Sequence, residues 1–226
     1  MSDGPSLSER YAAVTDGIAE ACRLAGRRDD PPTLIVVTKF HPVSLTRELI
    51  ELGVRDVGEN RHQDAAPKAA ELVDEPLTWH FVGQLQSNKA KAVARYVGAV
   101  HSVDRASLVT ALAGAETALD VFLEVNLTDD PRRGGVDPSG VDALAEAVLS
   151  TEHLRLQGVM AVAPLDEDPR AAFARLRGIS DRLRALAPHA THMSAGMSGD
   201  YAEAIAEGTT HLRIGTAITG KRPSPL

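Results

Sequence analysis

The sequence predicts an α/β fold in which eight parallel strands and their intervening helices close into a single (β/α)8 barrel of the TIM type, with an extra helix before the first strand. Two observations support this fold. Short apolar runs of strand length occur eight times, and longer segments rich in Ala, Leu, Glu and Arg with helical spacing separate them. An open doubly wound sheet is the alternative, but no G-x-G-x-x-G turn follows the first run to support it. The closed barrel is therefore the favoured interpretation.

The segment before the first apolar run predicts an amphipathic helix over residues 7–25. Ser6 followed by Glu9 fits a capping box at its start, and Gly26 fits a helix stop. The apolar residues fall on one stripe at helical spacing: Leu7, Tyr11, Val14, Ile18 and Cys22. We expect this stripe to cover part of the barrel.

The eight apolar runs predict the strands. They span residues 33–39, 53–58, 78–83, 98–103, 119–126, 156–162, 190–194 and 210–215. Residues 141–149 and 171–186 are examples of the helical segments between them. No low-complexity linker interrupts this alternation, so residues 1–226 are expected to form one domain, with residues 221–226 as a frayed tail.

Composition excludes several classes of function. The 226 residues include 24 Lys and Arg against 31 Asp and Glu, a net charge of −7, which argues against non-specific binding to nucleic acid or to anionic membranes. Cys22 is the single cysteine, which excludes an internal disulfide and a cysteine-based zinc site. No basic segment precedes an apolar leader, and no apolar run is long enough to span a bilayer. We expect a cytoplasmic protein with neither a nucleic-acid nor a membrane partner.

Lys39 ends the first apolar run and is the most informative residue of the chain. A lysine amine that is partly removed from water is more readily neutral, and a neutral amine forms Schiff bases with aldehydes. The alternative is a lysine that only ends the strand in solvent. The residues at the other strand ends favour a chemical role for Lys39, because active sites of such barrels lie at the carboxyl ends of the strands.

Polar residues also follow the other predicted strands, except the sixth. They include Glu59 and Asn60, residues 83–89, Ser102 and Asp104, Glu124 and Asn126, residues 194–198, and residues 213–216. Any one of them could be a turn or a helix cap. Together they would converge on one rim of the barrel.

The last two strand ends suit an anion. Gly196, Gly215 and Gly220 allow the backbone to approach a ligand closely. Ser198 is expected to cap a helix over residues 200–207, and the segment after Gly215 is expected to begin a short extra helix. Phosphate sites in these barrels often lie after strands seven and eight. Plain helix capping is the alternative.

Arg213 shares a strand face with His211 and Gly215. If this face points into the barrel, the guanidinium needs an acceptor, from a ligand or from a carboxylate such as Glu59 or Glu124. The alternative places Arg213 on the outer helix layer. His80 and His101 are interpreted as core or rim groups rather than metal ligands, and we expect no metal site.

The chain resembles the pyridoxal-phosphate homeostasis proteins, the single-domain relatives of the alanine racemase barrel. The W-H-F-x-G-x-L-Q-x-N-K stretch over residues 79–89 is the most specific match. The other matching segments are V-V-T-K at 36–39, G-E-N at 58–60, S-V-D at 102–104, G-V-M at 158–160, S-A-G-M-S-G-D at 194–200 and R-I-G-T-A-I at 213–218. Thr38, Phe40, Gln84 and Ala195 depart from the usual pattern, and Phe40 could alter the wall of the pocket.

The resemblance implies an internal aldimine between Lys39 and pyridoxal 5′-phosphate. It also implies that Asn60 lines the pocket near Lys39 and that Arg213 lies near the pyridine nitrogen. The phosphate contacts that it implies come from the seventh and eighth strand ends, at Ser194, Ser198, Gly215 and Thr216.

An arginine cannot readily give a proton to the pyridine nitrogen, which disfavours aminotransferase chemistry. Racemisation needs a second base besides Lys39. The resemblance implies that the larger racemases take theirs from an additional domain of a partner subunit, and we expect no such domain here. We therefore expect a protein that holds, buffers or delivers pyridoxal 5′-phosphate inside the cell, with PLP-dependent apoenzymes as candidate recipients. A PLP-dependent amino-acid racemase is the alternative function. We expect a monomer.

Overall fold

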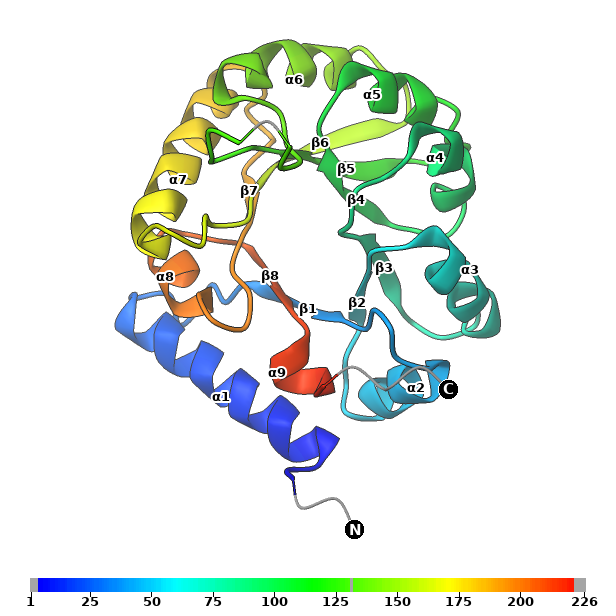
Figure 1. Cartoon of the computed structure of the whole chain (residues 1–226), viewed down its shortest axis with the longest axis vertical. Helices are drawn as coiled ribbons and strands as arrows, with labels where there is room; N and C mark the ends of the chain where they lie inside the picture. Colours follow the sequence, from blue (N-terminus) through cyan, green and yellow to red (C-terminus); the bar gives the residue numbers. More distant parts are fainter. Residues whose placement is uncertain (1–3, 131, 222–226) are drawn as a thin grey trace.

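The computed structural model is a closed barrel of eight parallel strands, which confirms the predicted fold (Figure 1). It describes residues 4–130 and 132–221. Each strand pairs with the next, and β8 returns to pair with β1. The strands are β1 (Thr33–Val37), β2 (Asp56–Glu59), β3 (Thr78–Phe81), β4 (Ala99–Val103), β5 (Leu119–Glu124), β6 (Leu154–Met160), β7 (His192–Ser194) and β8 (His211–Ile214).

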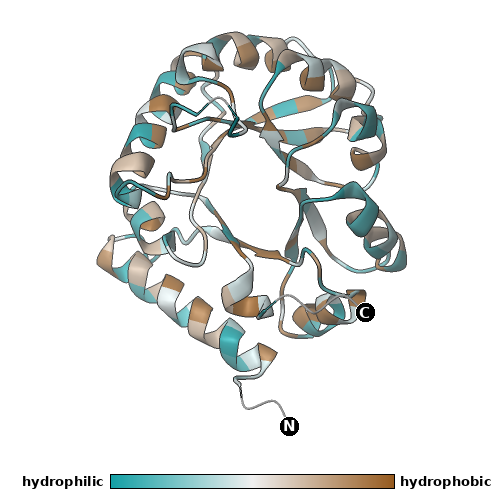
Figure 2. Ribbon diagram, viewed as in Figure 1, coloured by the Kyte–Doolittle hydropathy of each residue, from teal (hydrophilic) through white to brown (hydrophobic). Residues whose placement is uncertain are grey.

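The helices form a ring outside the strands (Figure 1). They are α1 (Leu7–Leu24), α2 (Val43–Glu51), α3 (His62–Glu71), α4 (Ser87–Val93), α5 (Ala106–Leu112), α6 (Val141–Leu149), α7 (Pro169–Leu186), α8 (Tyr201–Ala206) and α9 (Thr216–Thr219). A short 3-10 helix, Pro138–Gly140, precedes α6. Brown and teal segments alternate along several helices in Figure 2, as expected of helices that bury one face.

The first helix begins as predicted. Ser6 and Glu9 form the capping box, and Gly26 takes a φ of +70° after the last turn. Val14, Ile18 and Cys22 are buried. The helix packs against α8 and α9, and Arg10 Nε donates a hydrogen bond to the Ile218 carbonyl at 2.7 Å. The helix therefore covers the junction where the barrel closes.

The core has two parts of different character. Most buried apolar side chains lie in one cluster that includes strand and helix residues. Polar side chains occupy much of the interior of the ring of strands. A hydrogen bond joins His101 of β4 to Ser194 of β7, and these strands are not neighbours in the sheet, so the bond must cross the interior. This interior differs from the usual barrel filling of branched apolar residues.

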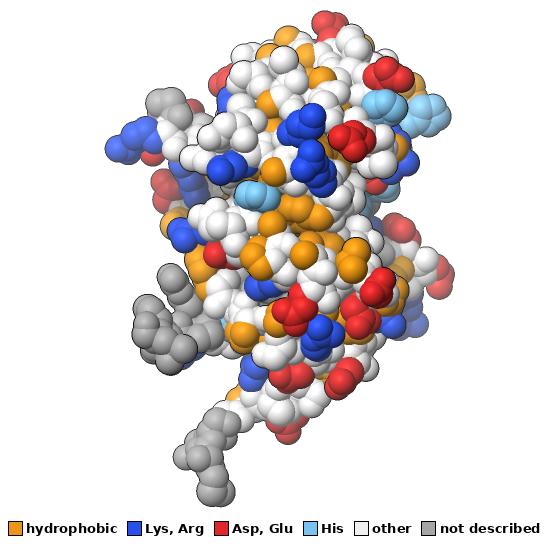
Figure 3. All heavy atoms as spheres, turned by 90° about the vertical axis from the view of Figure 1, so that its right-hand side faces the viewer, with side chains coloured by type: hydrophobic (Ala, Val, Ile, Leu, Met, Phe, Trp, Pro, Cys, Tyr) orange, Lys and Arg blue, Asp and Glu red, His pale blue; other side chains and the backbone are white. Residues whose placement is uncertain are grey.

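The strand boundaries agree with the predicted ones to within a few residues. Lys39 lies two residues beyond β1, and the predicted frayed tail lies outside the described residues except for Lys221. No helix in the described part of the chain is both long and apolar enough to cross a membrane. Acidic and basic side chains are interspersed with apolar ones on the side of the barrel that Figure 3 shows.

Candidate functional site

Lys39 is exposed at the carboxyl end of β1. Its Nζ lies 5.9 Å from the centre of the Phe40 ring, and the Arg61 guanidinium carbon lies 5.3 Å from the same ring. No ion pair reaches the Lys39 amine from the residues described. Lys39 is thus more exposed than the partial burial considered for it. The next residue, Phe40, has a φ of +68°, which is uncommon for a residue with a side chain.

A second lysine lies beside this strand end, and it is buried. Lys68 Nζ, from α3, is 2.6 Å from Glu59 Oε1 and donates to the Thr38 carbonyl at 3.0 Å. Glu59 Oε1 also accepts from the Thr38 hydroxyl at 2.8 Å. These bonds hold Thr38 through both its backbone and its side chain, and so they fix the backbone that presents Lys39.

Asn60 follows Glu59 at the end of β2. Its Oδ1 is buried and has no hydrogen-bond partner among the described residues. Gly83 lies directly against it, because a Cβ added to Gly83 would be 2.5 Å from the Asn60 carbonyl oxygen. Glycine at this position lets the ends of β2 and β3 approach closely and fixes where the Asn60 amide lies.

Glu124 ends β5 in a half-buried position. Burial and the charge of Asp104 raise its pKa to about 7, although Arg213 acts in the opposite direction. Its Oε2 also lacks a partner among the described residues. Buried polar atoms without partners are rare and call for a ligand or water to satisfy them.

Arg213 points into the barrel and is 5 % exposed, so the alternative of an outer position is wrong. Its Nη1 donates to Ser194 Oγ at 2.7 Å and its Nη2 to the Ala161 carbonyl at 2.9 Å. The expected carboxylate partner is also wrong in part: Glu59 faces α3, and Glu124 acts on Arg213 only through its charge. Burial lowers the pKa of Arg213 to about 10, so it remains a cation at neutral pH.

Ser194 is fully buried, and its hydroxyl is shared between Arg213 and His101. His101 in turn contacts His80, whose Nε2 lies 3.0 Å from Asp56 Oδ1 at the start of β2. The phosphate contact implied for Ser194 stays a prediction. The prediction that His80 and His101 are core groups is confirmed by their burial.

The predicted anion site brings two loops together. Ser198 Oγ accepts a hydrogen bond from the Ala217 backbone N–H at 3.4 Å, which links the loop after β7 to the first turn of α9. The expected capping role of Ser198 is wrong, because Asp200 is the N-cap of α8. Gly215 is the N-cap of α9, so the short helix expected after it is confirmed.

Gly215 and Thr216 lie close to the strand end that leads to Lys39. A Cβ added to Gly215 would be 3.4 Å from the Val37 carbonyl oxygen. Thr216 is exposed and begins α9. The structure therefore places Lys39, Asn60, Arg213, Gly215 and Thr216 at the carboxyl ends of three consecutive strands of the closed ring, β8, β1 and β2.

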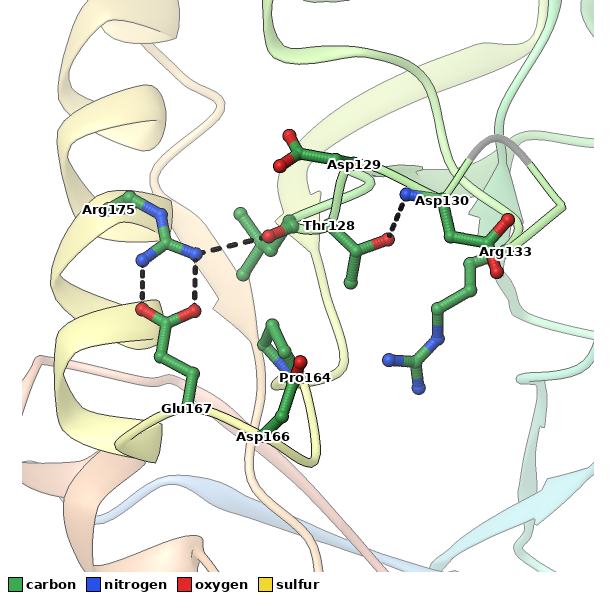
Figure 4. A pocket seen from close by; sticks show the side chains of 9 residues that line it. Thr128, Asp129, Asp130, Arg133, Pro164, Asp166, Glu167 and Arg175 are labelled. Carbon is green, nitrogen blue, oxygen red and sulfur yellow. Dashed lines mark hydrogen bonds and ion pairs between the residues drawn. The ribbon is translucent and has the colours of Figure 1, made fainter.

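Two cavities lie at the same rim. One of about 440 Å³ is lined by Asn60, Gly83 and Lys89, among others. Another of about 740 Å³ lies between the loops after β5 and β6, where Arg175 binds Glu167 through two parallel contacts and Arg133 extends toward Pro164 and Asp166 (Figure 4). The larger cavity contains none of the predicted site residues, so size alone does not locate the site.

Sequence reasoning missed Lys68 and the bonds that link the two histidines. A signal for Lys68 exists: it falls on the apolar stripe of α3 with Ala65, Ala69 and Leu72, a position where an exposed lysine is not expected. Within the described ranges, no group of three His, Cys, Asp or Glu side chains is arranged to hold a metal ion.

Comparisons with known proteins identify the family of this chain. Residues 15–223 match the family model of the alanine racemase N-terminal domain. A pyridoxal phosphate homeostasis protein of Pseudomonas aeruginosa is 43% identical, with 96% of each chain covered. One of Mycobacterium tuberculosis is 41% identical, with 96% of this chain and 93% of the relative covered.

A solved structure extends the comparison to three dimensions. PipY of Synechococcus elongatus, determined with PLP bound, has a TM-score of 0.81 and 33% identity over 95% of this chain and 100% of that one. The matches span the barrel from α1 to α9. The chain therefore belongs to the alanine racemase N-terminal domain family and, within it, to the pyridoxal phosphate homeostasis proteins.

Proposed function

We propose that this chain binds pyridoxal 5′-phosphate in the cytoplasm and serves its homeostasis, holding the cofactor for buffering or for delivery to apoenzymes. The observation that supports this most directly is that an exposed Lys39, whose amine has no ion pair among the described residues, and a buried Arg213 lie at the carboxyl ends of neighbouring strands. The names of the relatives and the PLP in PipY point the same way.

The residues present fit each part of the cofactor. The amine of Lys39 suits its aldehyde, and the cation of Arg213 suits the ring nitrogen as an acceptor. The Ser198 hydroxyl, the Thr216 hydroxyl and the backbone at Gly215 offer donors to a phosphate. Asn60 Oδ1 and Glu124 Oε2 are buried polar atoms that need partners.

Lys39 is the residue that we propose holds the cofactor covalently. The neutral amine would condense with the aldehyde, forming a C=N bond and releasing the carbonyl oxygen as water. When bound, the cofactor supplies an electrophilic carbon and an electron sink. Thr38, Glu59 and Lys68 would keep the Lys39 backbone in place, and the left-handed turn at Phe40 would keep the amine accessible from solvent.

Arg213 favours a carrier over an amino-acid enzyme. A cation that keeps its proton leaves the ring nitrogen unprotonated, which weakens the electron sink. The racemase alternative needs a second base besides Lys39. Glu124, at the end of β5, has a pKa raised to about 7, which suits proton transfer, so the experiment below includes a test for this activity.

The decisive experiment combines a spectrum with chemical trapping. Purified protein mixed with pyridoxal 5′-phosphate should gain a visible absorption band, borohydride should abolish it, and peptide mass spectrometry should find the reduced cofactor on Lys39. Protein that stays colourless would contradict the proposed binding. Label on Lys89 or Lys91 would move the attachment to another lysine.

Two further measurements address the finer claims. The protein should not exchange the α-hydrogen of amino acids in deuterated water, and rapid exchange with any common amino acid would favour the racemase. Loaded protein should activate a PLP-dependent apoenzyme, and analytical ultracentrifugation should show a monomer. Failure to activate several such apoenzymes would leave buffering as the role.

A further inference from the structure

An unbroken series of hydrogen-bond contacts runs through the barrel interior to Arg213. The contacts join Asp56 Oδ1 to His80 Nε2 at 3.0 Å, His80 Nδ1 to His101 Nε2 at 2.9 Å, His101 Nδ1 to Ser194 Oγ at 2.9 Å, and Ser194 Oγ to Arg213 Nη1 at 2.7 Å. The five residues come from β2, β3, β4, β7 and β8. We call them the interior chain.

Proton counting gives the interior chain a direction. Arg213 can only donate, and the Asp56 carboxylate can only accept. With both imidazoles neutral, only one arrangement gives each contact one proton. Arg213 donates to Ser194, Ser194 to His101, His101 through Nε2–H to His80, and His80 through Nε2–H to Asp56. The interior chain thus connects a cation to a carboxylate through three neutral groups, and each group donates its hydrogen bond in the direction of Asp56.

The surroundings support the neutral arrangement. His101 is fully buried and stacks on Phe122 with ring centres 4.2 Å apart. Burial, reinforced by His80, Arg213 and His211, holds the pKa of His101 well below its ordinary value. The side chain of Asp56 is 29 % exposed, so one end of the interior chain meets solvent at the amino-terminal end of the barrel.

Other charged and titratable groups also face the interior chain. His211 of β8 lies near both His101 and His192, and burial lowers its pKa to about 3. Glu124 of β5 and Asp200, the residue before α8, act on Arg213 through their charges. None of these groups makes a hydrogen bond within the interior chain in the described structure.

We propose that Asp56, His80, His101 and Ser194 are positioning residues for Arg213, and that they set the charge that Arg213 presents to the ring of the bound cofactor. This inference rests on the proposed function. Ser194 fixes one edge of the guanidinium, and the carboxylate of Asp56 partly compensates its charge through the polarised bonds. Asp56 therefore acts on the cofactor from the opposite end of the barrel.

The first test examines the interior chain without any cofactor. Nitrogen-15 NMR of the histidine rings should find both His80 and His101 protonated at Nε2 only. A proton on Nδ1 of His101 would reverse its bond to Ser194 and overturn the proposed direction. This result does not depend on cofactor binding, so it stands or falls separately from the proposed function.

The second test removes the charge and keeps the shape. Asn at position 56 can still accept a hydrogen bond from His80 through Oδ1, so Asp56→Asn should fold. With less compensation, the positive field of Arg213 should disfavour the protonated form of the bound cofactor. The midpoint of the pH-dependent change in the visible band of loaded protein should fall by several tenths of a pH unit. No shift would overturn the proposal.

Asp120→Asn is a matched control. Asp120 stands near the start of β5 with 31 % side-chain exposure, but its partners are Arg155 and Gln157. It should leave the midpoint unchanged. An equal shift in both variants would mean a general effect of net charge and would overturn a role for the interior chain.

A double-mutant comparison tests transmission through the bonds. His101→Leu removes both ring nitrogens and so interrupts the interior chain, and in that background Asp56→Asn should produce no further shift. Full additivity would overturn transmission through His101. If wild-type protein takes up no pyridoxal 5′-phosphate at all, the proposed function fails and the role of the interior chain toward the cofactor fails with it, whatever the NMR result.

Discussion

Consecutive residues at the ends of β1 and β2 behave in opposite ways. Thr38 and Glu59 are fully buried and bonded to each other and to Lys68. Lys39, which follows Thr38, is exposed. Asn60, which follows Glu59, carries a buried oxygen without a partner among the described residues. We call Thr38, Glu59 and Lys68 the support set, and Lys39, Asn60 and Glu124 the mouth set.

The difference follows from the alternation of side chains along a strand. The support set bonds within the fold, although Glu59 Oε2 has no hydrogen-bond partner among the described residues. The mouth set lies at the carboxyl ends of the strands, where a ligand can bond to its polar atoms. Changes in the support set should therefore alter stability, and changes in the mouth set should alter binding. Four predictions test this contrast, from the largest expected effect to the smallest.

Lys39→Ala should remove all borohydride-fixed cofactor. Because the side chain is exposed and unpaired among the described residues, the free energy of unfolding should change by less than about 0.5 kcal/mol. Trapping with mass spectrometry and urea unfolding check the two parts. A large loss of stability would place Lys39 in the support set and contradict the contrast.

Lys68→Met should have the opposite result, a large loss of stability with cofactor trapping retained. It leaves the Glu59 carboxylate buried without its cation and removes a donor from the Thr38 carbonyl, which should cost about 3–5 kcal/mol of unfolding free energy. Molecules that fold should still trap the cofactor on Lys39. The double change Glu59→Gln with Lys68→Met should regain part of the loss, and a single-variant loss below about 1 kcal/mol would refute the support role.

Glu124→Gln should stabilise the protein at alkaline pH. The pKa of Glu124 is raised to about 7, so the native state favours the protonated form, and its contribution to stability is lost as pH rises from the ordinary value through about 7. At pH 8 the variant should exceed wild type by roughly 3 kcal/mol, and below pH 4 the two should converge. Parallel pH profiles from urea unfolding would contradict this assignment.

Gly83→Ala should have a smaller effect, on both stability and cofactor binding. The new methyl group would press on the Asn60 carbonyl at 2.5 Å, so we expect a loss of about 1–2 kcal/mol and weaker retention of the cofactor in dialysis. Gly178→Ala is the control, because a Cβ there meets open space within α7 and should stabilise by about 0.5–1 kcal/mol. Unaltered retention in Gly83→Ala would separate Asn60 from binding.

Local patterns made the barrel predictable, and long-range contacts limited the prediction of the site. Eight apolar runs and helical spacing gave every strand, and the capping box gave the start of α1. The partners of Arg213 could not be predicted, because Ser194 and Ala161 come from other strand ends whose orientation depends on register. The backbone next to Lys39 could not be predicted either, because Phe40 takes a positive φ and a phenylalanine gives no warning of it.

The contact between α1 and α9 has a consequence for biosynthesis. Arg10 binds a carbonyl of the last helix, and β1 pairs with β8, so the earliest elements of the barrel to leave the ribosome take partners from the latest. Until β8 and α9 emerge, the predicted anion site at Gly215 and Thr216 is incomplete, and α1 lacks the helices α8 and α9 that pack against it. The proposed coenzyme site uses residues that follow or belong to both β1 and β8, so it would form only after the ring has closed.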